Sequence, residues 1–270
     1  MTAAALPVEG SDRPWPLSLA LRLARALVVV AALVGTWQLV LSVFHVEPYH
    51  VPPPRVTFEA LVDQRGFLFE SLVTTFASTA AGLAVSAVVA FALASVFVAS
   101  PTTERALLPI ALFVRSLPIV AMAPLLTIVA GRGWRTSLFC VSVVTFFPML
   151  VNAAQGLRSV KPEMRELFRV NAASRWQLLR QARLPIATPY MLTGIRVAVS
   201  VGVLGAMTAE WLTGSQGLGY LLQRAASRRQ LGLLWAGVVV STGAAVAIFA
   251  FTVAVERRVL RRYAPDRVQS

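Results

Sequence analysis

Few residues of this chain have the types and spacing that catalysis or metal binding requires. The single lysine, Lys161, lacks the glycines of a GxxxxGK[ST] phosphate-binding loop, and no serine stands in a GxSxG motif. The two histidines, His45 and His50, have no further ligands clustered beside them, and the one cysteine, Cys140, lies inside an apolar run. The sequence therefore predicts that this chain is not an enzyme and holds no metal or cofactor of its own.

Polar side chains inside apolar segments are the better candidates for function. Hydrophobic residues make up 57% of the 270 positions and charged residues only 14%, which is typical of a protein that crosses the membrane many times. Polar groups are costly to bury in lipid, so we treat those found there as functional candidates. The candidates for a translocation path are Arg115, Ser116, Asn152, Gln155 and Glu210.

Arg115 has two interpretations that the sequence leaves open. It stands three residues before Pro118 on an apolar segment. In the first interpretation its guanidinium lines the path and meets an anionic or polar solute. In the second it is structural, and either reaches the membrane surface or bonds the carbonyl oxygens that Pro118 leaves free.

The remaining candidates are also open. Asn152 and Gln155 lie about one helical turn apart, so they are expected to face the same cavity if they line the path. Arg196 and Glu210 are about four turns apart and cannot pair within one straight helix. Glu210 precedes Trp211 at the end of its segment, where a role at an interface or gate competes with simple solvation.

Six apolar segments must position these residues, and they predict an all-α, polytopic membrane protein. Gly82 and many alanines and serines in the second segment allow helices to approach closely in lipid. The third segment is interrupted by Arg115, Pro118 and Pro124. The segments are Ala26–Phe44, Ser71–Thr103, Ala106–Ala130, Thr136–Leu157, Ile186–Leu212 and Leu231–Val255.

The distribution of basic residues orients these segments. With six crossings both termini lie on one side, and the loops of that side hold sixteen basic residues against seven on the other. Positive residues favour the cytoplasm, so both termini are expected inside a bacterial plasma membrane. Residues 1–20 are expected to form a cytoplasmic tail, residues 21–262 the membrane domain, and residues 263–270 a second cytoplasmic tail.

The external loops have their own expectations. Residues 45–70 read as a polar external segment in which Val51–Pro54 is stiff and extended. Residues 213–230 read as a glycine-rich external loop. Both are assigned to the outer side by the same count of basic residues.

The stretch Pro162–Tyr190 is basic and amphipathic, although apolar segments flank it on both sides. We expect two short helices joined by a tight turn. Met164, Leu167 and Phe168 share one helical face by their spacing, and Arg165, Glu166 and Arg169 lie off that face. Ser174 followed by Gln177 is a capping-box pattern, and Pro185 is expected to end the second helix.

Three functions compete for this stretch. A helix-turn-helix that binds DNA is disfavoured because a segment tethered between two membrane spans is poorly placed to enter a major groove. A positively charged topological loop needs no partner. Docking onto a cytoplasmic partner is favoured, because the pattern is too ordered for a charge anchor alone. We therefore expect no nucleic-acid partner.

The same stretch resembles the loop of ABC-importer permeases that docks into a cleft on the ATPase subunit. That family carries Glu-Ala-Ala, three residues, Gly, nine residues and an apolar-x-Leu-Pro ending. Glu166 stands at the Glu position, Ala172 at the Gly position and Ala182 at the apolar site, while Leu167 and Phe168 replace the two alanines. The resemblance implies an ATPase-coupling loop at about residues 158–186, with coupling residues Met164, Glu166, Leu167, Phe168, Ala172, Ala173, Ser174, Leu184 and Pro185.

A second set of motifs resembles the nitrate/sulfonate/taurine group of these permeases over roughly residues 26–262. It comprises Glu210 followed by Gly217–Tyr220, Ser116–Pro118 with Pro124–Leu125, Trp235–Gly237 and the proline-rich Val51–Pro54. Ala130–Gly133 departs from the pattern, which has an aromatic residue before Gly-x-Gly, and Ala172 replaces a glycine.

The resemblance implies a type I importer fold and a set of partners. Two copies of the permease form one pathway, two ATPase subunits bind ATP and Mg below it, and an extracytoplasmic binding protein delivers the solute. The solute implied is small and polar or anionic, like nitrate, sulfonate or taurine, or a vitamin precursor. The alternative functions are an ATP-independent secondary carrier and a non-transporting membrane scaffold.

Overall fold

The computed structural model describes residues 15–47 and 49–263, and the described part is helical with short connections. It falls into two units, residues 1–58 and 59–270. The first unit contains α1 (Trp15–Val43), so residues 15–20, expected in the N-terminal tail, are helical. The rest of that expected tail and residues 264–270 lie outside the described residues.

The second unit is built from long helices with shorter ones between them. α2 (Pro54–Asp63) crosses the boundary between the units. The helices that follow are α3 (Arg65–Ala99), α4 (Pro101–Ser116), α5 (Ile119–Ala130), α6 (Trp134–Arg158), α7 (Pro162–Val170), α8 (Arg175–Leu178), the π-helix η1 (Leu179–Arg183), α9 (Leu184–Thr213), α10 (Leu218–Ser227) and α11 (Leu231–Tyr263).

The described helices agree with the expected order of apolar segments. Four runs are long and apolar enough to cross a membrane: Arg65–Ala99, Trp134–Arg158, Arg175–Thr213 and Leu231–Val259. The pair α4 and α5 forms a fifth, bent by 100°. α1 carries a shorter apolar stretch, Leu27–Val43. The all-α fold class is confirmed, and the third segment is a helix pair with a sharp bend between α4 and α5.

The break in the third segment lies where the sequence placed its first interruption. α4 ends at Ser116, and Leu117 and Pro118 are extended before α5 begins. A residue before proline avoids the α region, which explains why Leu117 leaves the helix. Pro109 and Pro124 lie inside α4 and α5 without ending them.

Both segments expected as external loops contain helix, so the expected loop structure was wrong. α3 begins at Arg65 rather than Ser71, and α2 precedes it. α10 occupies most of residues 213–230. The apolar residues Leu68, Leu221 and Leu222 explain both corrections, because they are buried against one another in one cluster. Their burial favours helix in segments that composition alone made look like loops.

Close contacts through glycine bring α6 against α3 and α9. A Cβ at Gly82 of α3 would lie 2.6 Å from the Cβ of Val141, and one at Gly194 of α9 would lie 2.9 Å from the Cβ of Asn152. A Cβ at Gly156 would lie 2.9 Å from the Cα of Ala187. Hydrophobic burial does not drive helix association in lipid, so tight van der Waals contact between small residues stabilises it instead.

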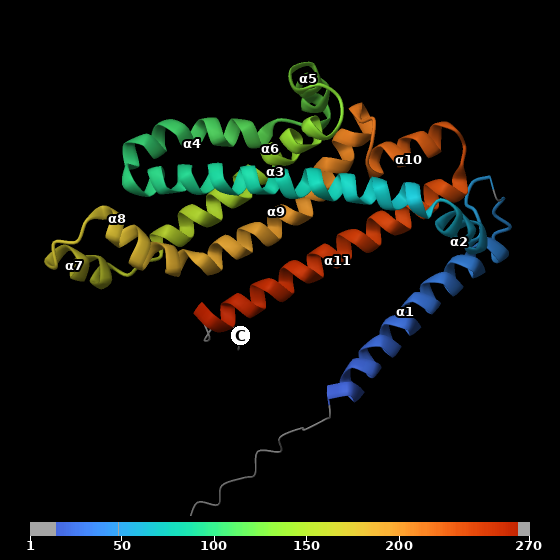
Figure 1. Ribbon diagram of the computed structural model, residues 1–270, viewed down its shortest axis with the longest axis horizontal. Coiled ribbons are helices and arrows are strands. Elements are labelled where there is room, and N and C mark those ends of the chain that lie inside the picture. Colours follow the sequence, from blue (N-terminus) through green and yellow to red (C-terminus); the bar gives the residue numbers. More distant parts are fainter. Residues whose placement is uncertain (1–14, 48, 264–270) are drawn as a thin grey trace, which may run out of the picture. The chain divides into compact units, whose positions relative to one another are not determined.

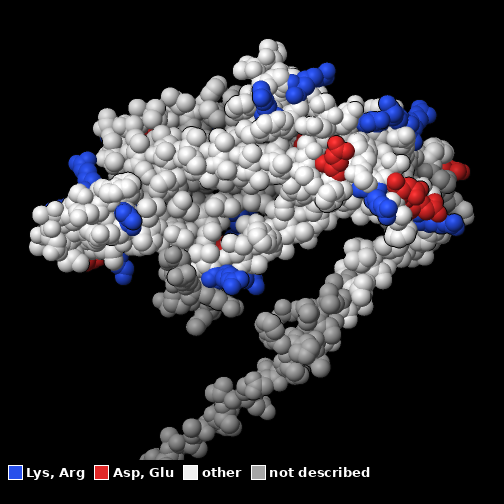
Figure 2. All heavy atoms as spheres, viewed as in Figure 1, with Lys and Arg blue, Asp and Glu red and all other residues white. Residues whose placement is uncertain are grey.

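Charged residues mark the two ends of this bundle. α7 and α8 project at one end of the long helices, and α10 packs at the other (Figure 1). The surface over the middle of α3 and α4 carries no charged side chain in the face shown, whereas Lys, Arg, Asp and Glu gather nearer the ends (Figure 2). An uncharged belt between charged ends is what a lipid bilayer selects.

The glycine contacts predict an asymmetric response to alanine. Gly156→Ala places a methyl group against the α9 backbone, which is expected to destabilise the protein by about 1–3 kcal/mol. Gly243→Ala on α11 is the matched control, since no other atom lies within 4 Å of its added Cβ. Thermal unfolding in detergent measures both. Equal melting temperatures for the two variants would contradict this packing.

Candidate functional site

The first candidate site is the exposed loop built by α7 and α8. Pro162 occupies the first turn of α7 and Glu163 follows it, where the helix dipole favours an acid. Met164 and Leu167 are 39% and 60% exposed, and Phe168 is half-buried beside them. The structure therefore presents the expected apolar face to the surroundings rather than to the bundle.

The turn after α7 explains the alanine at the family's glycine position. The amide of Ala173 donates to the Phe168 carbonyl oxygen at 2.9 Å, and the amide of Ala172 donates to that of Arg169 at 3.0 Å. These two bonds form a Schellman motif, whose key residue is usually glycine in the left-handed region. Ala172 has φ of 50° and therefore adopts this region with a Cβ.

The expected capping box of the second helix is confirmed. The Ser174 hydroxyl accepts from the Gln177 amide at 3.2 Å, and the Gln177 side chain accepts from the Ser174 amide at 2.6 Å. These bonds satisfy amides that the helix start leaves free. Hydrogen bonds within the loop therefore hold the turn both at the end of α7 and at the start of α8.

The expectation that Pro185 ends the second helix was wrong. α8 continues through η1 into α9 as one helical run, Arg175–Thr213. The amide of Leu184 donates to the Leu179 carbonyl oxygen, five residues back, so the chain widens by one residue just before the proline. Pro185 then falls in the first turn of α9, where its missing N–H costs little.

The second candidate site is a cavity of about 590 Å³ between α4, α6 and α9. Arg115, in the last turn of α4, and Asn152 of α6 both line it. The Arg115 guanidinium lies 4.7 Å from the centre of the Phe147 ring, a cation–π contact. The Asn152 amide donates to the Pro148 carbonyl oxygen at 2.8 Å. Apart from these residues the lining is mainly aliphatic.

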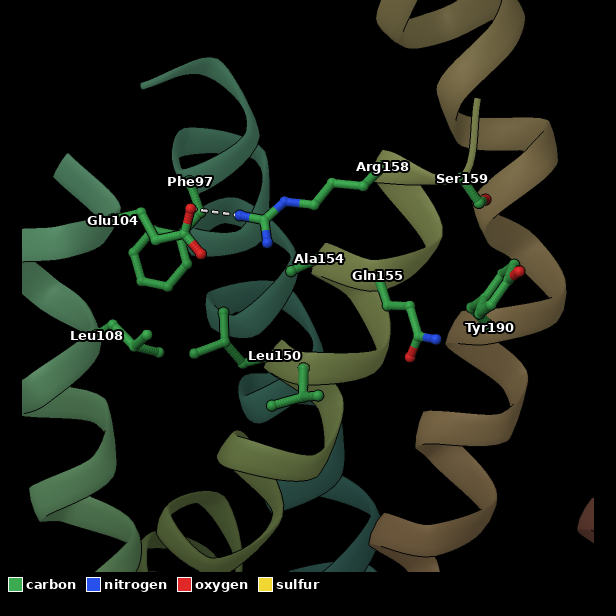
Figure 3. A pocket seen from close by; sticks show the side chains of 10 residues that line it. Phe97, Glu104, Leu108, Leu150, Ala154, Gln155, Arg158, Ser159 and Tyr190 are labelled. Carbon is green, nitrogen blue, oxygen red and sulfur yellow. Dashed lines mark hydrogen bonds and ion pairs between the residues drawn. The ribbon is translucent and has the colours of Figure 1, made fainter. Parts of the chain in front are cut away.

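A third feature is a cavity of about 480 Å³ nearer the α7–α8 end. Gln155 lines it, and its side chain extends from α6 towards Tyr190 of α9 (Figure 3). An ion pair between Glu104 of α4 and Arg158 of α6 borders the same space (Figure 3). The structure thus places Asn152 and Gln155 in two successive cavities rather than one.

The remaining path candidates lie elsewhere. The Ser116 hydroxyl bonds the Leu112 carbonyl oxygen of its own helix, and Ser116 lines neither cavity. Glu210 lines neither of them and lies near the far end of α9. As expected, Arg196 does not pair with Glu210. Its guanidinium bonds Glu256 of α11 at 2.8 Å.

Glu210 is buried, with 2% of its surface exposed, so simple solvation is excluded. Its Oε2 accepts from the Thr75 hydroxyl at 2.8 Å and from the Gly219 amide at 3.0 Å. The Thr75 hydroxyl in turn accepts from the Leu218 amide at 2.8 Å. A buried carboxylate needs such partners. The network ties the start of α10 to α3 and α9.

The glycines after Glu210 follow from this network. A Cβ at Gly217 would lie 2.5 Å from each carboxylate oxygen of Glu210, and Gly217 has φ of 95°. A Cβ at Gly219 would collide with the Met207 carbonyl oxygen. Both positions therefore need glycine. The spacing of Glu210 to these glycines was visible in the sequence, but its partner Thr75 is 135 residues away.

Sequence reasoning also missed three partners of arginines. Glu104 read only as part of a turn, Phe147 as an apolar span residue, and Glu256 as the end of the last span. Each lies on a different helix from its arginine, at separations of 54, 32 and 60 residues respectively. Periodicity within one segment carries no signal for such pairs.

Comparison with known proteins gives a consistent picture. Residues 82–262 match the family described as "Binding-protein-dependent transport system inner membrane component". The taurine transport system permease protein of Escherichia coli (strain K12) is 31% identical over 92% of this chain and 90% of its own length. The formylaminopyrimidine transport permease protein of Halalkalibacterium halodurans is 32% identical over 66% of this chain and 72% of its own length.

A solved structure shares the fold. A chain of the inward-facing MetNI methionine ABC transporter superposes with a TM-score of 0.60 at 19% identity. The match covers 74% of this chain and 96% of that one.

The left-handed turn at Ala172 predicts that glycine improves it. Ala172→Gly removes the Cβ from this conformation and is expected to stabilise the turn by about 1 kcal/mol. Ala173→Gly, one residue on, is the control and should loosen the turn slightly. Hydrogen exchange of the α7 and α8 amides measures both. Slower exchange in Ala173→Gly than in Ala172→Gly would refute the turn geometry.

The Glu210 network predicts a specific role for Thr75. Thr75→Val keeps the side-chain shape but removes both cross-helix hydrogen bonds, at a cost of about 1–3 kcal/mol. Thr74→Val is matched, since its hydroxyl bonds the Glu70 carbonyl oxygen of its own helix, and should cost under about 0.5 kcal/mol. Faster hydrogen exchange of α10 in Thr75→Val alone is expected. Unchanged exchange would show that the network does not hold α10.

Proposed function

Because this chain belongs to the family of binding-protein-dependent transport system inner membrane components, it is a permease subunit of an ABC importer, and we propose that α7 and α8 dock onto its ATPase partner. In this proposal two copies of the chain enclose the pathway. The ATPase subunits bind ATP and Mg, and an extracytoplasmic binding protein delivers the solute from the other side.

The observation that carries the docking proposal is the exposed apolar face of α7 beside a closed turn. Leu167 is 60% exposed, and it does not belong to any of the helices that are long and apolar enough to span a membrane. Leu167, Phe168 and Gln177 help to line a hollow of about 390 Å³ between the two short helices. A loop that served only to fix topology by charge would need neither feature. Exposed apolar residues on an ordered segment favour a protein partner.

The charge of this loop supports a cytoplasmic position. Seven basic residues lie between residues 158 and 185, and positive loops favour the cytoplasmic side. α10, at the opposite end of α9, then faces outward. With the six crossings expected from the sequence, both termini lie on the same side as α7 and α8. This orientation puts the docking face where ATP is.

The connection from this loop into the membrane supports a coupling role. Arg158 is the last residue of α6, directly before the loop, and it pairs with Glu104 in the first turn of α4. Displacement of α7 by the ATPase therefore acts on the start of the broken third span. ATP changes the balance between the inward- and outward-facing states of the permease only if the ATPase pair binds these two states with different affinities.

The solute in this proposal is small and polar or anionic. One relative is named for taurine and another for formylaminopyrimidine, so the names alone span charged and uncharged compounds. The competing functions, an ATP-independent carrier and a membrane scaffold, need no ATPase. Co-purification separates them, because an importer permease brings down an ATPase subunit from its native membrane.

If α7 docks through its apolar face, substitutions on its two faces are expected to have different effects. Leu167→Ser removes the exposed apolar contact and is expected to weaken ATPase co-purification about tenfold or more. Arg169→Ser places the same residue on the opposite face of α7 and should leave co-purification within about threefold. Membrane yield of each permease is the folding control. Equal retention of the ATPase by both variants would exclude docking through this face.

A further inference from the structure

Two cavities follow one another along a single face of α6. The cavity around Arg115 takes Val144, Phe147 and Val151 from α6, and the cavity beside Arg158 takes Val151 and Gln155. These positions recur at three- and four-residue spacing, so they share one side of the helix. Val151 lines both cavities and separates them. The two cavities are therefore neighbours along one face of α6, from its middle towards its end.

Arg115 is the only charged residue that lines the cavity between α4, α6 and α9, which we call the first cavity; the cavity beside Arg158 is the second. At 1.5 Å per residue it lies about 20 Å along α4 from the helix start, which is less than the hydrocarbon thickness of roughly 30 Å. Among the described residues it has no acidic partner within ion-pair distance, and its contact is the Phe147 ring. Arg115 is exposed in this chain, and a guanidinium that meets the hydrocarbon layer needs water or an anion beside it.

The structural interpretation of Arg115 has no support in the described hydrogen bonds. One of its two forms has the guanidinium bond carbonyl oxygens freed by Pro118, but the described bonds include none from Arg115; the other form, in which Arg115 reaches the membrane surface, involves no such bond. At the same break the amide of Leu117 bonds the Val114 carbonyl oxygen at 3.3 Å. The guanidinium instead lies over an aromatic ring at the cavity wall.

Arg196 shows how this chain treats a structural arginine. Its guanidinium bonds Glu256 at 2.8 Å, and the Thr193 hydroxyl donates to the other oxygen of the same carboxylate at 3.1 Å. The charge of Arg196 is thus neutralised within the protein. Arg158, beside the second cavity, is likewise paired with Glu104. Arg115 differs from both because its positive charge is directed at a cavity without a counter-ion.

We propose that the cavity between α4, α6 and α9 binds the anionic group of the transported solute, with Arg115 as the residue that selects it. The proposal rests on the permease function and narrows its substrate class to small oxyanions, such as a sulfonate, nitrate or carboxylate group. The flat guanidinium fork suits two oxygens of such a group. A volume of about 590 Å³ accommodates a small solute.

The same arrangement explains release. The second cavity is lined by one acid and one arginine that neutralise each other, so it offers no unpaired positive charge. The anion is therefore held most strongly beside Arg115 and less strongly as it passes Val151. Transport requires binding that is strong enough for entry but weak enough for departure.

A single reporter thiol tests the proposal on the chain itself. The native Cys140 is buried, so Val151→Cys supplies one accessible thiol between the two cavities. Two thiol reagents of similar size are compared, the anionic sulfonatoethyl and the cationic trimethylammonioethyl methanethiosulfonate. Arg115→Gln is expected to lower the ratio of anionic to cationic modification rates about tenfold. Arg115→Lys should keep the ratio. Arg105→Gln, which lies nearer the start of α4 and away from the cavity, should leave it unchanged.

A second measurement with the same thiol distinguishes binding of an anion in the cavity from a general effect of positive charge on the approach of the reagents. At constant ionic strength, methanesulfonate should slow the modification saturably when Arg115 or lysine is present, and at least fivefold less effectively in Arg115→Gln. Dimethyl sulfone, which has no charge, should not protect. Equal protection in Arg115→Gln, or none in the parent, would overturn the proposal. ATPase co-purification tests the permease assignment separately, so the two failures are distinguishable.

Discussion

The close approach of α6 to α3 and α9 is the constraint on which the rest of the structure depends. Glycines at the crossings let the backbones come near enough for van der Waals contact to replace the hydrophobic driving force that lipid does not provide. One side of α6 is committed to this packing. Val144 and Asn152, which meet glycines of α9, also line the cavity beside Arg115, and the end of α6 carries the α7–α8 loop. In the proposed function the same helix connects the surface that docks onto the ATPase with the surface that meets the solute.

Polar groups within the bundle fall into two kinds once their partners are known. Oε2 of Glu210 and the guanidinium of Arg196 bond groups on other helices, which ties the bundle together at α10 and α11. Arg115 is not satisfied in this way and lies against open space. Because an unpaired charge in lipid is costly, the absence of an acidic partner for Arg115 among the described residues supports the proposal that it binds a ligand.

Local signals in the sequence predicted much of this arrangement. The order of apolar segments, the break before Pro118 and the Ser174–Gln177 cap all follow from short-range chemistry, and each is present in the structure. The helix across Pro185 was missed because a π-turn absorbs the proline. The partners of Glu210 and Arg158 were missed because they lie on other helices, and no spacing rule reaches across a fold.

Coupling between the loop and the cavities is the central claim, and movement of the loop on nucleotide binding tests it most directly. Val170 ends α7 and is 81% exposed, so a spin label there reports the loop without disturbing the bundle. In the assembled transporter, electron–electron resonance distances between the two labels should shorten when a non-hydrolysable ATP analogue closes the ATPase pair. A distance distribution that does not change with nucleotide would contradict the account.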